Sequence, residues 1–401
     1  MNYSQDELSL KSLINDADSS PCESSLLHSY PASMPAFLAS RLIKKYTTND
    51  DCVFDPFCGT GVVLIEGLRL NRNCIGTDLQ ESVIRIITAS INIPESNILW
   101  SVWGDIRKSA YSSISMFGER YEKSSLNSYE FLRPWFHWKT FEMIMAIHAQ
   151  IIKIHCKKTQ EIFLLLLAGS LISMSKRRER GIVHWGWVAD NVIPKQDELV
   201  FVDSFKVFND RLTKIISFVN SLDSCNLIEK SKNTLSMLQH NWLKCDDNLL
   251  NEIIKPVDLL LTSPPYPYSI DYSLALRLTN YLLGYDFNNF RKKEIGARYK
   301  RKRKNRSYDY LYELGISLKM ASRFVKINGY VVLILPDPID YPNVLDFDVE
   351  AWLGHLQAKL AGEWRLVDFA HRNCQHRRVI NSNQKVKNEI VAVYQRKFNL
   401  S

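Results

Sequence analysis

The chain has 401 residues, of which 46% are hydrophobic and 23% charged, with 15 Gly and 14 Pro. This composition excludes a disordered or fibrous protein, and the length exceeds that of one small domain. The net charge is +8, but ten Lys or Arg and one Glu between Arg291 and Arg306 give this segment alone a charge of +9, so the other residues sum to −1. Such a block fits either a solvated loop or a contact with a polyphosphate.

Residues 1–29 are rich in Ser, Asp and Glu, which predicts a poorly ordered lead-in. The opening residues, MNYSQDE, show neither the basic nor the apolar region of a secretory signal, so we expect a cytoplasmic protein. None of the eight cysteines forms a C-x-x-C pair, which favours free thiols and no structural metal site, although His371, Cys374 and His376 lie close together.

The stretch from Asp51 to Asp78 has the pattern of a strand, a tight turn, a helix and a second strand. The apolar residues 52–54 precede the turn DPFCGTG, and the helical run 62–70 and the strand 73–78 follow it. This is the β-α-β order of a parallel sheet, and it predicts an α/β fold.

Between about 120 and 235 the chain has helical periodicity instead, as at 138–153 and 160–174, which predicts an inserted helical lobe. The longest apolar run, 162–174, has 13 residues. A membrane span needs ~20, so this run predicts a buried helix and no membrane partner.

Strand patterns return at 257–262 and 329–335, and the alternating runs 364–369 and 389–394 predict an antiparallel edge. One mixed, mostly parallel sheet would thus be assembled from both sides of the insertion. We therefore divide the chain into a lead-in at 1–29, a first half of the sheet domain at 30–118, a helical insertion at 119–235 and a second half of the sheet domain at 236–401.

Gly59 and Gly61 of the turn DPFCGTG allow a sharp bend and a close approach of the backbone to a ligand. A dinucleotide-binding loop would have a third glycine at position 64, where this chain has Leu64. Asp78, at the end of the next strand, is placed to accept both hydroxyls of a ribose. These features predict a site for an adenosine without phosphates, with a plain strand-to-helix turn as the alternative.

A second motif, TSPPY at 262–266, ends an apolar strand. Together with DPFCGTG and the acidic strand end, it resembles the S-adenosylmethionine-dependent DNA amino-methyltransferases, which modify cytosine N4 or adenine N6. The segments Tyr30-Pro31-Ala32, Ile270-Asp271-Tyr272 and 290–296 resemble one cytosine-N4-specific subgroup of that family. The resemblance, scattered between about residues 28 and 300, implies a Rossmann-like methyltransferase fold and S-adenosylmethionine as cofactor.

In that family the second motif works on an amine whose lone pair is delocalised into the base. Ser263 Oγ and the Pro264 carbonyl would accept its hydrogens, and the two prolines would hold the acceptors rigidly, because proline fixes φ and has no N–H. Tyr266 would stack on a base taken out of the duplex. The implied catalytic residues are Ser263, Pro264, Pro265 and Tyr266, and the implied cofactor-binding residues are Asp55, Pro56, Phe57, Gly59, Thr60, Gly61, Asp78 and Asp246.

The third cofactor-binding acid has two candidates. Asp246 precedes Ser263 by 17 residues, in an arrangement like that of the relatives. Asp105 is the alternative if chain order after Asp78 decides.

Double-stranded DNA is the implied partner, and the basic block predicts its phosphate contacts, mostly without sequence preference. The glycine loop precedes SPPY here, unlike in most SPPY enzymes, which leaves the place of target recognition open. The helical lobe, with its basic run Lys176-Arg177-Arg178, is a candidate. The oligomeric state and a cognate restriction endonuclease are left open. The predicted DNA-binding residues are Arg291, Lys292, Lys293, Arg298, Lys300, Arg301, Lys302, Arg303, Lys304 and Arg306.

The residue before Pro-Pro is serine, which favours methylation of cytosine N4 in a restriction-modification or related system. The alternatives are adenine N6 in DNA and guanine N2 in tRNA, whose enzymes usually have Asp at that position. An inactive DNA-binding subunit is a third hypothesis, against which the two intact motifs argue. Cytosine-C5 chemistry needs a cysteine nucleophile, and the single Pro-Cys pair is Pro21-Cys22, in the predicted lead-in.

Overall fold

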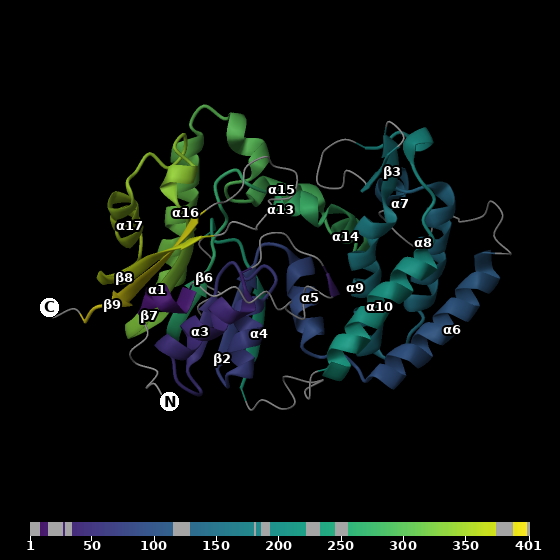
Figure 1. The fold of residues 1–401 in the computed structure, drawn as a ribbon, viewed down its shortest axis with the longest axis horizontal. Coiled ribbons are helices and arrows are strands. Elements are labelled where there is room, and N and C mark those ends of the chain that lie inside the picture. Colours follow the sequence, from purple (N-terminus) through teal and green to yellow (C-terminus); the bar gives the residue numbers. More distant parts are fainter. Residues whose placement is uncertain are drawn as a thin grey trace.

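The computed structural model describes residues 9–14, 27–28, 34–114, 129–179, 182–185, 193–221, 233–244, 256–373 and 388–398. Within them, a seven-stranded sheet forms one lobe, with the strand order β5-β2-β1-β6-β7-β9-β8 (Figure 1). The strands are β1 (Cys52–Asp55), β2 (Asn73–Asp78), β5 (Leu235–Gln239), β6 (Val257–Thr262), β7 (Val325–Pro336), β8 (Trp364–Asn373) and β9 (Asn388–Arg396).

The sheet is mixed and mostly parallel, as predicted. Strands β5, β2, β1, β6 and β7 run parallel, whereas β9 lies antiparallel to both β7 and β8. The central pair, β1 and β6, comes from the two sides of the helical lobe, with Val53 opposite Leu259. The prediction of one sheet assembled across an insertion is therefore confirmed.

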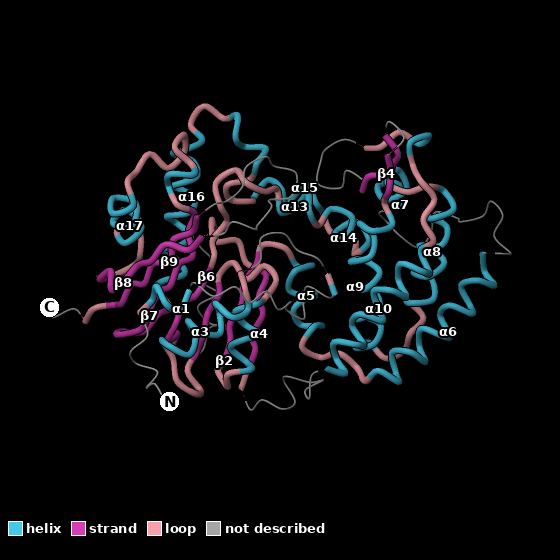
Figure 2. The backbone as a smooth tube through the Cα atoms, viewed as in Figure 1, coloured by secondary structure: helices cyan, strands magenta, loops and turns pink. Residues whose placement is uncertain are grey.

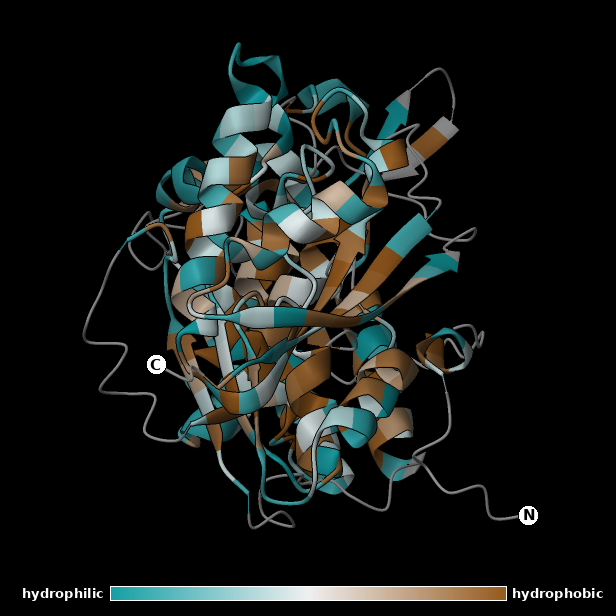
Figure 3. Ribbon diagram, turned by 90° about the vertical axis from the view of Figure 1, so that its left-hand side faces the viewer, coloured by the Kyte–Doolittle hydropathy of each residue, from teal (hydrophilic) through white to brown (hydrophobic). Residues whose placement is uncertain are grey.

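Helices cover both faces of the sheet, because successive strand residues point to opposite sides. On one face, Val332 and Ile334 of β7 join a core with α3 (Ala36–Tyr46), α4 (Val62–Arg69) and α5 (Glu81–Ser90). On the other face, Val331 and Leu333 pack with α16 (Arg306–Ser322) and α17 (Val349–Gln357). In Figure 3 the central strands are mostly brown, which agrees with a sheet buried on both sides.

A second lobe is built almost entirely from helices and shares one core (Figure 2). The predicted buried helix is α9, whose residues 165–168 are fully buried. The lobe begins with α6 at Ser96, ahead of the expected position 119, and it also includes α14 from the second half of the sheet domain. Its helices are α6 (Ser96–Ile114), α7 (Tyr129–Leu132), α8 (Trp138–Ile151), α9 (Lys157–Met174), α10 (Ser204–Ser221) and α14 (Arg277–Leu282).

The run after α9 departs from the helical texture of this lobe. Strand β3 (Lys176–Glu179) pairs antiparallel with β4 (Ile182–Trp185), with Arg178 opposite Val183. The shorter elements of the fold are α13 (Tyr272–Ala275), α15 (Phe287–Lys293), η1 (Arg133–Trp135), η2 (Gln196–Glu198), η3 (Arg298–Lys302) and η4 (Pro338–Asp340).

Two segments of the predicted lead-in, residues 9–14 and 27–28, are described and contact the folded lobes, and the order of the rest stays a prediction. Helix α1 (Leu10–Ile14) packs on α3 and β8, and its apolar side chains at spacings of three and four residues are buried. Leu27 joins the core of the helical lobe, and His28 hydrogen-bonds Thr279. These residues tie the N-terminal region to both lobes.

The described cysteines Cys52, Cys58, Cys74 and Cys156 are free thiols, and the first three are buried. No described helix is both long and apolar enough to cross a membrane.

Candidate active site

The loop from Asp55 to Gly61 connects the end of β1 to the start of α4, as the motif DPFCGTG predicts. Gly59 and Gly61 have φ angles of +48° and +74°, in the left-handed region that favours glycine. A Cβ on Gly61 would lie 2.7 Å from Ile87 Cγ1. Glycine at position 61 therefore serves both the backbone conformation and the close packing of the loop on α5.

Asp78, at the end of β2, holds this loop in place. Its Oδ2 accepts from the Gly59 N–H at 3.2 Å, and its Oδ1 accepts from the Gln80 N–H at 2.9 Å. Burial raises the pKa of Asp78 to about 6. The glycine loop and the acidic strand end thus form one unit.

The two sequence motifs meet through Asp55 and Thr262, which lie at the ends of the adjacent strands β1 and β6. The Thr262 hydroxyl donates to Asp55 Oδ1 at 2.6 Å, and the Phe57 N–H donates to the same oxygen at 3.1 Å. Burial also raises the pKa of the Asp55 carboxyl to about 7. This bond brings the residue before Ser263 against the first residue of the glycine loop.

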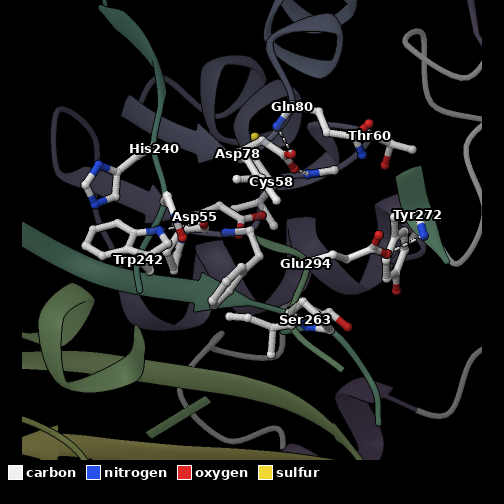
Figure 4. A pocket seen from close by; sticks show the side chains of 18 of the residues that line it. Asp55, Cys58, Thr60, Asp78, Gln80, His240, Trp242, Ser263, Tyr272 and Glu294 are labelled. Carbon is white, nitrogen blue, oxygen red and sulfur yellow. Dashed lines mark hydrogen bonds between the residues drawn. The ribbon is translucent and has the colours of Figure 1, made fainter. Parts of the chain in front are cut away.

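A cavity of about 900 Å³, its open mouth included, lies over these strand ends. Its lining joins both motifs (Figure 4). The predicted site residues that line it are Asp55, Pro56, Phe57, Gly59, Thr60 and Asp78 from the first motif and its strand end, and Ser263 and Pro265 from the second.

Three predicted residues are not among those lining the cavity, and a fourth lies outside the described residues. Gly61 and Pro264 are not among the residues that line the cavity. Gly61 instead packs closely against Ile87 of α5. The Tyr266 ring is 9% exposed and its hydroxyl donates to Glu389 at 3.0 Å, so stacking of a base on Tyr266 stays a prediction. Asp246 lies outside the described residues, as does the resembling segment Tyr30-Pro31-Ala32.

The alternative acid, Asp105, does not belong to this site. It is exposed on α6 in the helical lobe and does not line the cavity.

Several lining residues were not predicted from the sequence. His240, Asn241 and Trp242 follow β5, and the Trp242 ring is anchored by hydrogen bonds from Nε1 to the Pro56 carbonyl and to Thr77 Oγ1. The signal was weak, because β5 is an edge strand with half-buried residues. Lys293, predicted as a DNA contact, lines this cavity instead. The other lining residues that were not predicted as site residues are Met34, Cys58, Val62, Val63, Leu79, Gln80, Tyr272, Glu294 and Ile295.

Glu294 is the one acid of the basic block, and the structure places it in the cavity wall. Its carboxylate accepts from the backbone N–H groups of Tyr272 and Ser273 and from the Ser273 hydroxyl. Burial raises the pKa of Glu294 to about 7. Glu294 therefore fixes the start of α13, which follows the second motif.

The basic block is not uniformly available for contact with a partner. Lys300 is 3% exposed, and its Nζ pairs with Glu313 at 3.0 Å, so we remove Lys300 from the predicted DNA contacts. The Arg291 guanidinium lies 4.5 Å from the centre of the Tyr299 ring. Four consecutive residues, Arg301, Lys302, Arg303 and Lys304, are exposed.

The charges around the cavity indicate the kind of ligand that it suits. Two buried carboxyl groups, Asp55 and Glu294, and the half-buried Asp78 line it, and Lys293 is the only Lys or Arg among the described lining residues. Such a wall disfavours phosphates and favours a cationic ligand with hydroxyl groups. Within the described part of the chain, no group of three or more His, Cys, Asp or Glu could hold a metal ion.

Comparison with known proteins matches residues 6–89 to a family described as DNA methylase. A relative in Methanocaldococcus jannaschii, the type II methyltransferase M.MjaI, is 37% identical over 67 residues, which are 17% of this chain and 22% of that protein. The type II methyltransferase M.MthZI of Methanothermobacter thermautotrophicus is 41% identical over 61 residues, 15% of this chain and 17% of that protein. The matches thus span about a fifth of the length of these relatives.

The crystal structure of TrmN from Thermus thermophilus aligns with 93% of this chain and 51% of its own, at 10% identity and a TM-score of 0.33.

Proposed function

We propose that this chain, whose residues 6–89 match the DNA methylase family, transfers a methyl group from S-adenosylmethionine to the N4 amine of cytosine in double-stranded DNA. The observation that carries the proposal is the hydrogen bond between Thr262 and Asp55, at 2.6 Å, beside a cavity lined by both motifs. If the glycine loop and the TSPPY corner lay on opposite sides of the molecule, the proposal would have no support.

The residues of the cavity fit this cofactor. S-adenosylmethionine is an adenosine with a cationic sulfonium and no phosphate, and when bound it supplies an electrophilic methyl group. Asp78 would accept the ribose hydroxyls with the lone pairs left by Gly59 and Gln80, and the loop 56–60 would bring backbone close to the ligand. The carboxyl groups of Asp55 and Glu294 favour the positive charge of this cofactor.

The second motif would prepare the amine. Ser263 lies in the cavity wall directly after the strand residue that bonds Asp55. Proline at 264 and 265 fixes the corner, and the Tyr310 hydroxyl donates to the Pro265 carbonyl at 3.0 Å, which anchors it further. Transfer between bound partners needs chiefly positioning and electrostatic support, which a rigid corner beside the cofactor provides.

The choice of cytosine rests on Ser263, because a serine before Pro-Pro resembles the motif of the cytosine-N4 subgroup. Adenine N6 in DNA is the alternative that the same corner would serve, and guanine N2 in tRNA is the second alternative. Both curated relatives are named type II methyltransferases. A restriction-modification setting, with a cognate endonuclease, is accordingly part of the proposal.

Analysis of nucleosides tests the reaction and the base together. Unmodified DNA is incubated with the protein and methyl-labelled S-adenosylmethionine, then digested and analysed by mass spectrometry, with tRNA as a parallel substrate. We expect labelled N4-methylcytosine. Label only in N6-methyladenine would overturn the choice of base, and label only in tRNA would overturn DNA as the substrate.

Ser263→Ala tests the role of the second motif. We expect methyl transfer to fall at least about 100-fold, because a positioned hydrogen-bond partner of the reacting group is lost, while the Kd for S-adenosylmethionine changes little. Ser12→Ala, on the exposed side of α1, is the matched control. Unchanged turnover in Ser263→Ala would remove the serine from the proposed chemistry.

A further inference from the structure

A second cavity lies beyond the second motif, separate from the cavity described above. It has a volume of about 1050 Å³, its open mouth included, and is formed by the turn after TSPPY, the basic block and the segment after β7. Tyr268, in its wall, is a non-glycine residue with a φ of +57°. Its N–H donates to the Gly296 carbonyl at 2.7 Å, so the basic block holds this turn in an unfavourable conformation.

Three arginines line this cavity: Arg298, Arg301 and Arg306. One acid, Asp340, lies in the lining as well, and its carboxylate accepts the Asn388 N–H at 3.2 Å. Among the described residues, no carboxylate forms an ion pair with Arg301 or Arg306. The local charge is therefore positive, in contrast to the acidic wall of the first cavity.

The two cavities are neighbours, because the same two chain segments line both. Ser263 and Pro265 line the first cavity, and Pro267 to Ser269 line the second. In the basic block, residues 293–295 belong to the first, and Arg298 begins the wall of the second. The second cavity therefore lies near any strand whose base enters the first.

We propose that the Arg298–Arg301–Arg306 cavity binds a phosphodiester of the DNA strand that carries the target base. Guanidinium groups match phosphate oxygens through paired hydrogen bonds, which makes such a contact stronger and more directed than a diffuse basic surface. The inference rests on the proposed function, since it takes the DNA strand at the second motif as its ligand. It adds a particular phosphate site to the general attraction of the basic block.

The test compares how tightly two protein variants, each lacking one positive charge, bind a DNA duplex that the wild-type protein methylates. Arg301→Ala removes a guanidinium that lines the cavity, and Lys302→Ala removes a charge from the next residue, which is also exposed but does not line it. We expect Arg301→Ala to raise the Kd for DNA about ten-fold or more, by loss of a charge-assisted pair, and Lys302→Ala about two-fold. The Kd for S-adenosylmethionine should stay unchanged in both, which also shows that both variants are folded.

A scan with single methylphosphonate substitutions identifies the phosphate. One position of the target strand should weaken binding by the wild-type protein and have no further effect on Arg301→Ala. Equal effects of Arg301→Ala and Lys302→Ala, or the absence of such a position, would overturn the proposal.

Binding of inorganic phosphate tests whether the cavity serves free phosphate rather than a phosphodiester of DNA. If phosphate binds the wild-type protein but not Arg301→Ala, while both bind DNA equally, the cavity serves free phosphate and the proposal fails. Because these readouts are binding constants, a protein that binds DNA through Arg301 without methylating cytosine would contradict the proposed function alone.

Discussion

The carboxylate of Asp78 has both oxygens on backbone amides, at 3.2 Å from the Gly59 nitrogen and 2.9 Å from the Gln80 nitrogen. These bonds fix the orientation of the carboxylate without using all of its lone pairs. One side chain thereby shapes the glycine loop and presents acceptors to the cavity. Its loss should affect the loop and the ligand together.

Asp78→Ala should weaken binding of S-adenosylmethionine by about ten-fold or more, since hydrogen bonds to a charged acceptor contribute about 1.5–3 kcal/mol each. Isothermal titration calorimetry measures the Kd. Asp105→Ala, which removes an exposed acid on α6, is the matched control and should leave the Kd within about two-fold. Equal affinities of Asp78→Ala and the wild-type protein would exclude Asp78 as a cofactor ligand.

At the scale of secondary-structure elements, the junction between β1 and α4 depends on Gly61 for two separable reasons. Gly61 has a φ of +74°, and an added Cβ would meet three atoms of Ile87 within 3.0 Å. Gly284 has a similar φ of +79°, but nothing lies within 4 Å of its added Cβ. The pair therefore separates backbone strain from steric overlap.

Gly284→Ala should lower the free energy of unfolding by about 1–2 kcal/mol, the cost of a left-handed alanine. Gly61→Ala should cost a further ~1–3 kcal/mol, because Ile87 or the loop must move. Urea denaturation of both variants measures the difference. Equal losses would mean that α5 adjusts to the added methyl group without cost.

The ends of β1 and β6 could be predicted from the sequence, because each is a short apolar run that is followed directly by its motif. Glu294 could not be assigned, since one acid within a run of basic residues has the pattern of a solvated segment. Its place in the cavity depends on the packing of that segment against the start of α13. Lys300 shows the reverse case, because its pairing partner Glu313 lies on a helix whose orientation the sequence does not give.

For the molecule as a whole, the buried carboxyl groups around the cavity couple folding to pH. Asp55 and Glu294 have pKa values raised to about 7 by burial, and Asp78 to about 6. In the unfolded chain such groups lose their protons near pH 4. Between these values the folded protein binds more protons, so its free energy of unfolding falls as the pH rises.

We therefore expect the ligand-free protein to lose stability from pH 6.5 to 8. His148, whose pKa is lowered to about 4 by burial, acts in the opposite direction, but only below about pH 6.5. Asp55→Asn should flatten the slope, because an amide oxygen at position 55 still accepts from Thr262 and Phe57 while carrying no charge. Urea denaturation at several pH values measures it, and equal slopes in both proteins would contradict the assignment to Asp55.

The bond between Asp55 and Thr262 joins residues 207 positions apart. During synthesis on the ribosome, β1 and β2 therefore emerge well before β6, with most of the helical lobe, α6 to α10, translated in between. Until β6 arrives, one edge of β1 has no strand to pair with, and the cavity lacks the wall that contains Ser263. A nascent chain cut short within the helical lobe would hold the entire glycine motif and still be unable to enclose its ligand.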